Sequence, residues 1–284
     1  MHLRLRPPHD YHVPEDVGLR CTNHEEEAMS ISDTAQRNHE RLFPGHTSTL
    51  KTTDPELVEV FDNFAFDEVL AYADARGNLD EKTRLMVTLA TLIAVQSLSE
   101  YKAILGGALN IGVTPVQAKE VLYQAVPYCG IAKVIDFVHA TNEILQSRGI
   151  SLPLEGQSTT TPENRYEKGL AVQKAIFGER IERMYGQSPE NQIHIHRYLS
   201  GNCFGDYYTR TGTDTKTREL LTFSMLLSLG GCEPQLKGHI QGNLNVGNDK
   251  DTLLGVVTQL LPYVGYPRSL NAIRCINEVV PEMG

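Results

Sequence analysis

The longest apolar segments of the chain have a helical period, and two of them match each other. KTRLMVTLATLIAV starts at Lys82 and KTRELLTFSMLLSL starts at Lys216, and both are apolar on almost every face. That pattern is typical of a helix buried in a bundle or in a subunit interface. Because no segment shows a sustained alternation of apolar and polar residues, the pattern predicts an all-α fold.

These two helices belong to an internal repeat. Further blocks match in the same order: GALNIG with GNLNVG, VLYQAVPYCG with VVTQLLPYVG, and ATNEIL with CINEVV. The spacing is 134 residues at the first block and 135 at the later ones. Both copies keep a Pro-Tyr-x-Gly motif, at Pro127 and Pro262, where we expect the helices to break. Self-similarity of this kind indicates two copies of one helical unit.

The repeat divides the chain into four segments. We expect residues 1–48 to be an N-terminal extension without fixed structure, because much of this segment is polar and has no periodicity. Residues 49–150 form a first, degenerate repeat and residues 165–284 a second repeat that carries the candidate active site. Residues 151–164, rich in Ser, Thr, Pro and Gly, form the linker. Met29, which opens MSISDTAQRNHERLF, is a plausible start of translation.

Composition narrows the class of protein. The 284 residues are 40% hydrophobic and 21% charged, as in an ordinary globular protein, and the formal net charge is −9. Such a charge argues against a nucleic-acid surface, which needs clustered cations. No apolar run approaches the roughly 18 residues of a membrane span, and MHLRLRPPHDYHVPEDVG has no apolar signal core. We therefore expect a cytoplasmic protein that acts on a small molecule.

The cysteines give no sign of a metal or disulfide framework. Cys21, Cys129, Cys203, Cys232 and Cys275 are widely spaced, and none belongs to a CxxC motif. In a cytoplasmic protein this pattern favours reduced thiols, most of them buried. We expect no metal site and no cofactor.

The stretch GGCEPQLKGH, residues 230–239, follows the second apolar helix and combines a thiol, a carboxylate and an imidazole. Two glycines end the first helix, and Pro234 suits the first turn of the next, which we expect to run to about Asn245. Cys232, Gln235 and His239 then share one helical face. Cys232 and His239 are separated by about 10.5 Å along the axis, too far for direct proton transfer. We expect Cys232 to gain acidity from the helix start instead.

Glu219 lies in the preceding helix. If the paired glycines reverse the chain, the two helices run antiparallel and Glu219 approaches the level of His239. A carboxylate–imidazole pair at the edge of an apolar bundle suits general acid–base chemistry. In the first copy Leu85 and Ile104 occupy the equivalent positions, so the fold itself does not require the polar pair. The alternative is a capped helix start with a hydrogen-bonded histidine of no catalytic role.

An anionic substrate would need a cation near this pair. Arg268 opens the last expected helix, and Arg218 and Lys237 flank the reactive face. The alternative for each of them is a solvated surface charge.

The block from Thr217 to Val279 resembles the carboxymuconolactone decarboxylase family, whose fold is shared with alkylhydroperoxidase-type proteins. RELL, GCEPQLKGH, the NVG turn, QLLPYVGYP and NAI carry the resemblance, and the first copy matches more loosely. The resemblance implies an all-α fold of duplicated alkylhydroperoxidase-like bundle units. It also implies assembly into rings, so we expect a homo-oligomer, a trimer of two-repeat chains.

The resemblance further implies catalytic roles for Glu219, Cys232 and His239. The peroxidase branch of the fold uses a CxxC pair, and here Gln235 stands at the second cysteine. A disulfide cycle would then need a distant partner such as Cys203. The chain therefore fits the decarboxylase branch better.

We expect a cofactor-free lyase or isomerase that acts on a small lactone carboxylic acid. His239 would be the general acid or base with Glu219 assisting it, and Gln235, Arg268 and Lys237 would bind the substrate. Two alternatives stay open: a thiol-dependent peroxidase that uses Cys232, and a non-enzymatic oligomer that binds a small ligand.

Overall fold

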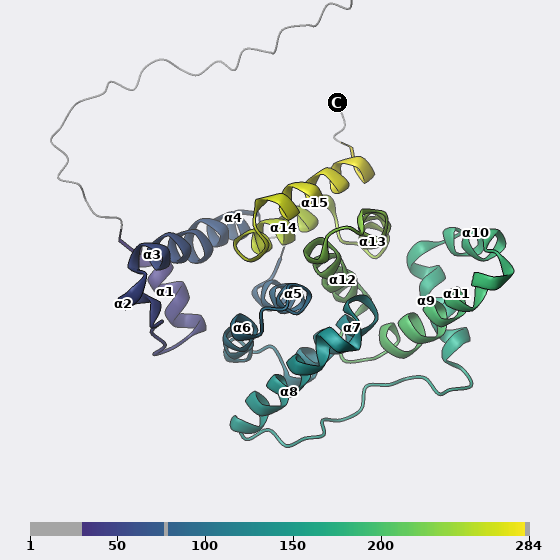
Figure 1. Ribbon diagram of the computed structural model, residues 1–284, viewed down its shortest axis with the longest axis horizontal. Coiled ribbons are helices and arrows are strands. Elements are labelled where there is room, and N and C mark those ends of the chain that lie inside the picture. The colour runs from purple at the N-terminus through teal and green to yellow at the C-terminus, as the bar shows by residue number, and fades with distance from the viewer. Residues whose placement is uncertain (1–29, 77–78, 282–284) are drawn as a thin grey trace, which may run out of the picture. The chain divides into compact units, whose positions relative to one another are not determined.

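The computed structural model describes residues 30–76 and 79–281, and every regular element within these ranges is helical (Figure 1). This confirms the all-α fold. The expectations about Cys21, Met29 and the rest of residues 1–29 lie outside the described residues. None of the described helices is long and apolar enough to cross a membrane.

The helices of the first repeat are α1 (Asp33–Leu42), α2 (Leu50–Thr53), α3 (Pro55–Asn63), the π-helical turn η1 (Phe64–Glu68), α4 (Val69–Arg76), α5 (Glu81–Ala94), α6 (Leu98–Asn110), α7 (Pro115–Cys129) and α8 (Ile131–Ser147). The second repeat contains α9 (Arg165–Phe177), α10 (Arg180–Gln187), the short η2 (Glu190–Gln192), α11 (Ile193–Tyr198), the π-helical η3 (Leu199–Tyr208), α12 (Thr215–Leu229), α13 (Glu233–Asn245), α14 (Lys250–Val264) and α15 (Tyr266–Val279). Residues 151–164 join α8 to α9 without forming a helix.

The two repeated apolar helices, α5 and α12, pack against each other in the middle of the bundle (Figure 1). Residues 84–94 of α5 and 218–228 of α12 are all buried, as their apolar faces predict. Ser228 Oγ donates to Thr91 Oγ1 across this contact at 3.1 Å. Covering these helices on every side removes a large apolar area from water, which is the main favourable term in folding.

The two repeats interleave rather than folding side by side. Helix α7 of the first repeat packs on α12 and η3 of the second, and α14 of the second packs on α5 and α4 of the first. Equivalent hydrogen bonds mark the exchange: Gln124 Nε2 donates to Thr222 Oγ1 at 3.1 Å, and Gln259 Nε2 to Thr88 Oγ1 at 3.4 Å. Helices of each repeat therefore cover part of the core of the other repeat.

The expectation that residues 1–48 have no fixed structure is wrong for the part that the structure describes. Helix α1 begins after Ser32, whose side chain accepts a hydrogen bond from the Ala35 N–H at 3.0 Å. Ala35 and Leu42 are buried against the bundle. The net polarity of the segment hid this amphipathic helix, because burying one side of α1 requires only a few apolar residues.

Helix α1 is the first repeat's counterpart of α9. Asn110 Nδ2 donates to the Leu42 carbonyl at 2.9 Å, and at equivalent positions Asn245 Nδ2 donates to the Ile176 carbonyl at 2.7 Å. The first structural repeat therefore begins with α1, before residue 49, where the first repeat was expected to begin.

A close backbone approach fixes η3 against α9. A Cβ atom at Gly169 would lie 1.9 Å from the Ser200 carbonyl oxygen, and one at Gly205 would lie 2.2 Å from the Arg165 carbonyl oxygen. Only glycine allows the two backbones to meet at this distance. The contact holds η3 in place, and η3 carries two aromatic residues of the site described below.

The turn between α12 and α13 follows the sequence prediction. Gly230 and Gly231 have φ angles of 68° and 70°, Pro234 lies in the first turn of α13, and that helix ends at Asn245. Positive φ strains any residue with a Cβ atom, so the glycine pair reverses the chain there.

The predicted breaks at the two prolines are displaced. Pro127 and Pro262 lie inside α7 and α14, which continue to Cys129 and Val264. Both helices end at the glycine of the Pro-Tyr-x-Gly motif, where φ becomes positive, because the glycine rather than the proline permits the turn.

Candidate active site

Helices α12 and α13 bring Glu219 and His239 together. The Nδ1 atom of His239 lies 2.9 Å from Oε2 of Glu219. The Glu219 side chain is fully buried, whereas 12% of the His239 side chain is exposed. A carboxylate in this position fixes the imidazole tautomer and stabilises its protonated form.

Both carboxylate oxygens of Glu219 have partners. Tyr208 of η3 donates its hydroxyl proton to Oε1 at 2.7 Å and also lies 2.9 Å from Thr222 Oγ1. Burial, with the Glu219 charge adding to it, raises the pKa of Tyr208 well above its usual value. Tyr208 therefore stays protonated as a donor, which lets a charged carboxylate be buried in an apolar bundle.

The second imidazole nitrogen faces a residue of the other repeat. His239 Nε2 lies 3.4 Å from the hydroxyl of Tyr128, which belongs to α7 and lies 3.1 Å from the Tyr208 hydroxyl. The acid–base pair lies in the second repeat, as predicted, but the site also contains Tyr128 of the first repeat. The reason is the interleaved packing, which places the end of α7 beside α13.

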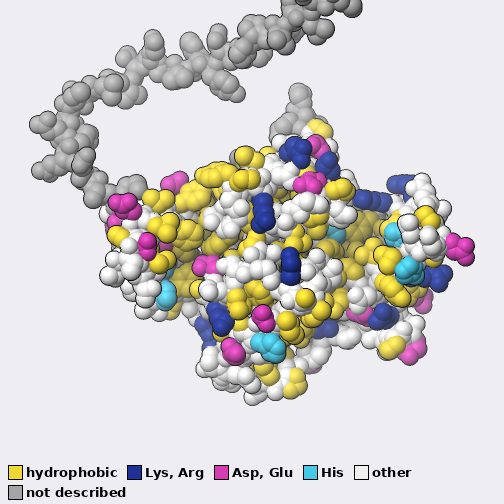
Figure 2. Space-filling view, in the orientation of Figure 1, with side chains coloured by type: hydrophobic (Ala, Val, Ile, Leu, Met, Phe, Trp, Pro, Cys, Tyr) yellow, Lys and Arg dark blue, Asp and Glu magenta, His cyan; other side chains and the backbone are white. Residues whose placement is uncertain are grey.

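A cavity of about 220 Å³ opens beside His239. The rings of Phe177 and Tyr128 stand edge-on to the imidazole, with centroids 5.2 and 5.4 Å away. The apolar part of the wall consists of Phe177, Ile181, Met184, Leu199, Phe204 and Leu226. In Figure 2, hydrophobic side chains gather between the helices of the bundle and the α9–α10 segment. The volume and the apolar lining suit a small organic molecule.

One cation and two amides complete the wall. Arg180 lines the cavity with its guanidinium above Gly238, where a Cβ atom would lie 2.9 Å from Nη1. Within residues 30–76 and 79–281, no carboxylate forms an ion pair with Arg180. Gln173 accepts a hydrogen bond on Oε1 from Ser200 Oγ at 2.5 Å, so its amide NH₂ is left for the cavity. Gln235 also lines the cavity, as its helical face predicted.

The other predicted cations lie elsewhere. Lys237 forms an ion pair with Glu278, Arg268 is exposed near Gly230, and neither lines the cavity. Arg218 is fully buried in an ion pair with Glu120 at 2.8 Å. Arg180 was missed because α10 lies outside the blocks that match between the two copies.

The thiols do not show the expected activation. Cys232 Sγ donates to the Leu226 carbonyl at 3.3 Å and does not line the cavity. Burial raises its pKa, and the neighbouring Glu233 adds to the effect, so the predicted acidification by the helix start is wrong in direction. Cys203 is closer to the site, with Sγ 3.7 Å from the Tyr128 hydroxyl, but burial raises its pKa to about 12.

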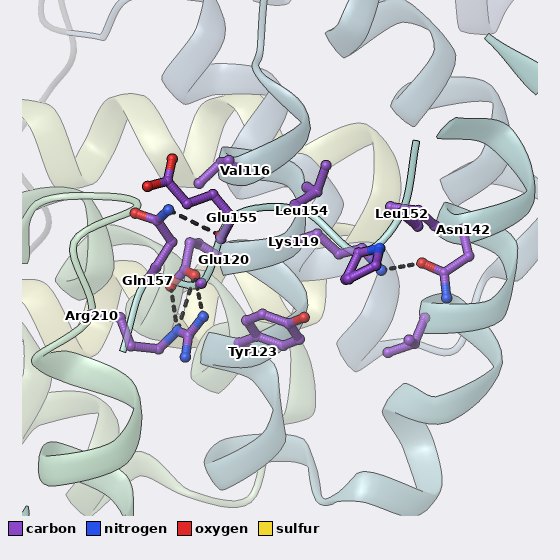
Figure 3. A pocket seen from close by; sticks show the side chains of 13 residues that line it. Val116, Lys119, Glu120, Tyr123, Asn142, Leu152, Leu154, Glu155, Gln157 and Arg210 are labelled. Carbon is purple, nitrogen blue, oxygen red and sulfur yellow. Dashed lines mark hydrogen bonds and ion pairs between the residues drawn. The ribbon is translucent and has the colours of Figure 1, made fainter. Parts of the chain in front are cut away.

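A larger cavity of about 410 Å³ lies between α7, α8 and the linker (Figure 3). Two carboxylates line it, Glu155 and Glu120, and Glu120 is neutralised by Arg210 at 2.9 Å and by the buried Arg218. Lys119 points across it to the Asn142 side chain, and burial lowers the pKa of Lys119. Linker residues 152–157 form one side of this cavity, and none of the lining residues is a histidine.

Fold and site together define a two-repeat helical protein with a carboxylate-oriented imidazole beside a small apolar cavity. The sequence profile described as the carboxymuconolactone decarboxylase family matches residues 55–143 and 194–278, one segment in each repeat and more than half of the chain. The chain therefore belongs to the carboxymuconolactone decarboxylase family.

Two known proteins are similar to this chain. The chain is 30% identical over 123 residues to a protein of Acinetobacter baylyi named 4-carboxymuconolactone decarboxylase, a match that covers 43% of this chain and 91% of the relative. A crystal structure from Burkholderia xenovorans, provisionally described as a gamma-carboxymuconolactone decarboxylase subunit, is similar with a TM-score of 0.52 and 22% identity. That match covers 86% of this chain and 96% of the other, and it supports the fold.

Proposed function

We propose that this protein is a cofactor-free carboxy-lyase that decarboxylates a small unsaturated lactone carboxylic acid. The observation that carries the proposal is the 2.9 Å contact between His239 and the buried Glu219 at the edge of an apolar cavity. The similarity to a protein named 4-carboxymuconolactone decarboxylase supports the same substrate class. Breakdown of aromatic compounds and a cytoplasmic location follow as parts of this proposal.

The cavity offers distinct places for the substrate's groups. Arg180 suits a carboxylate that the substrate retains, because neutralising the departing carboxylate would oppose its conversion to CO₂. The departing carboxylate belongs against the apolar wall, where poor solvation of the charge favours its loss. The amides of Gln173 and Gln235 can donate to the lactone carbonyl oxygen.

The reaction then needs one proton. The bond between the ring carbon and the departing carboxylate breaks, and its electron pair moves into the conjugated lactone carbonyl as CO₂ leaves. The Nε2–H of protonated His239 gives its proton to a carbon of the resulting enolate. Glu219 keeps its hydrogen bond at Nδ1 and stabilises the imidazolium before the transfer.

The test is CO₂ release from a panel of lactone carboxylic acids. His239→Ala should lower kcat by about 10²- to 10⁴-fold, the range for loss of a general acid. Cys232→Ser should keep most of the activity, since its thiol lies outside the cavity. The reverse result, with peroxide consumption lost in Cys232→Ser, would replace this proposal with the thiol peroxidase.

We also propose that the chain forms a homo-oligomer, a trimer of two-repeat chains. Ile131 and Ile135 at the start of α8 are exposed, and so are Tyr266 and Leu270, which lie 135 residues further on at the start of α15. Apolar pairs exposed at equivalent positions of both repeats support repeated contacts between chains. Light scattering should give three times the chain mass, and Leu270→Glu should lower it. A monomeric wild-type chain would refute the proposal.

A further inference from the structure

The first repeat keeps its own version of the cavity. A space of about 310 Å³ lies between α1, α3 and α6. Its residues His39, Phe43 and His46 are 134 positions before Gln173, Phe177 and Arg180 of the His239 cavity, and Glu100 and Ala103 are 135 positions before Gln235 and Gly238. The two cavities are therefore equivalent parts of the two repeats.

The frame of this second cavity is preserved. Phe43 packs on Gly107 as Phe177 packs on Gly242, since a Cβ atom at either glycine would lie 2.8 Å from the ring. The equivalent asparagine bonds to α1 and α9 hold both walls in the same way. The cavity has thus kept its walls although Leu85 and Ile104 replace the acid–base pair, and both of these residues are buried.

Its polar groups, in contrast, are different. Asp62 of α3 and Glu100 of α6 both line the cavity, whereas the His239 cavity has Arg180 and two amides. Only 7% of Asp62 is exposed, and no described residue forms a hydrogen bond or ion pair with it. An ionised carboxylate covered to this extent needs a cationic partner.

The remaining charged groups do not supply that partner. Burial lowers the pKa of His39, which favours its neutral form, and His46 is exposed. His39 and the exposed Lys51 both lie close enough for a positive charge on them to lower the pKa of Asp62, but burial outweighs both effects and raises that pKa. Burial also raises the pKa of Glu100.

An apolar wall surrounds the two carboxyl groups. Phe43, Phe61 and Phe66 line the cavity and stack edge-on in a chain, with Phe66 centroids 6.1 Å from Phe43 and 6.2 Å from Phe61. Aromatic faces attract organic cations as well as apolar groups.

We propose that the first repeat's cavity binds a small organic cation, a molecule with a protonated amine on an apolar or aromatic body. The ammonium group pairs with Asp62 and Glu100, and the body lies against the three phenylalanines. This site is separate from the His239 cavity and does not depend on the reaction proposed there.

The experiment is a calorimetric titration of the full chain with 2-phenylethylamine at neutral pH, with 3-phenylpropionate as the matched anion. The amine should bind and the acid should not. Asp62→Asn and Glu100→Gln should each weaken amine binding at least tenfold. Gln235→Ala, which changes the residue equivalent to Glu100 in the other cavity, should leave amine binding unchanged.

A third variant guards against misfolding of Asp62→Asn. Ala103→Leu keeps both carboxyl groups but fills the cavity, so it should also abolish binding of the amine. The proposal is overturned if the amine does not bind, if the acid binds more tightly, or if folded Glu100→Gln and Ala103→Leu bind the amine like the wild type.

Discussion

The Nδ1 atom of His239 lies 2.9 Å from Oε2 of Glu219, and the two side chains come from consecutive helices that a pair of glycines folds back on each other. The carboxylate is buried completely while the imidazole borders a cavity. One residue is thus placed to act on a substrate, and the other to hold that residue in its orientation.

Replacing Glu219 with Gln should separate these two roles. The amide keeps the size of the side chain but removes the charge that stabilises the imidazolium, so kcat should fall by about 10²- to 10⁴-fold with little change in KM. Steady-state assays of CO₂ release over a pH series measure this. Glu278→Gln, which changes a half-exposed carboxylate, is the control. A Glu219→Gln enzyme within twofold of the wild type would show that the pair is only structural.

The acid–base pair could be predicted from the sequence because its determinants are local. Gly230 and Gly231 have positive φ angles and a proline follows in the next turn, so the chain reverses there. Glu219 and His239 are 20 residues apart on the two helices that this turn joins, and the turn is enough to bring them together. The first copy has Leu85 and Ile104 at the equivalent positions, which indicates that the fold itself does not need the acid–base pair.

The rest of the site depends on long-range packing, which the sequence pattern does not contain. Tyr128 belongs to the first repeat and reaches His239 only because α7 packs on the second repeat. Tyr208 and Arg180 lie in segments outside the blocks that match between the copies. A helical period indicates which face is buried but not which helix covers it.

Arg180 should control substrate affinity. Arg180→Gln removes the cavity's cation while keeping a polar side chain, so we expect KM for a lactone acid to rise by about tenfold or more, as for loss of a charged hydrogen bond of about 1.5–3 kcal/mol. Chemistry at His239 is untouched, so kcat should change less. Lys237→Gln is the matched control because Lys237 pairs with Glu278 away from the cavity. Equal KM values for the two variants would contradict this assignment.

The buried thiols predict a loss of stability at high pH. Burial raises the pKa of Cys203 from 9.0 to about 12 and that of Cys129 from 9.0 to about 11. Below pH 9 the two thiols are protonated in both the folded and the unfolded chain, so the free energy of unfolding keeps their full contribution. Above pH 9 the unfolded chain releases these protons first, so the free energy of unfolding decreases as the pH rises. Urea unfolding between pH 8 and 10.5 measures the slope, which should be shallower in Cys203→Ala. An unchanged slope would mean that the Cys203 thiol ionises normally in the folded protein.

Glu120 should be important for stability rather than for catalysis. It forms ion pairs with the fully buried Arg218 at 2.8 Å and with Arg210 at 2.9 Å. Glu120→Gln would leave a buried guanidinium without a counter-charge, which costs about 3–5 kcal/mol. The exposed ion pair between Lys237 and Glu278 offers the comparison, since Glu278→Gln should lower the free energy of unfolding far less. Both values follow from urea unfolding at pH 7, and similar losses in the two variants would refute the difference.

The two copies of one glycine give the sharpest comparison between the repeats. A Cβ atom at Gly242 would lie 2.6 Å from Glu219 Oε2, whereas one at the equivalent Gly107 would lie 2.8 Å from the Phe43 ring. Alanine favours a helix at either position by roughly 0.5–1 kcal/mol. Gly242→Ala must displace the carboxylate that orients His239, so kcat should fall at least tenfold while the protein stays folded.

Gly107→Ala makes the same chemical change in the repeat that has no acid–base pair. It can displace only an aromatic ring, so CO₂ release should stay near the wild-type rate. Assays of CO₂ release measure kcat for both variants, and circular dichroism shows whether each variant is folded. If the two alanines lower kcat equally, the position of the Glu219 carboxylate does not control the reaction.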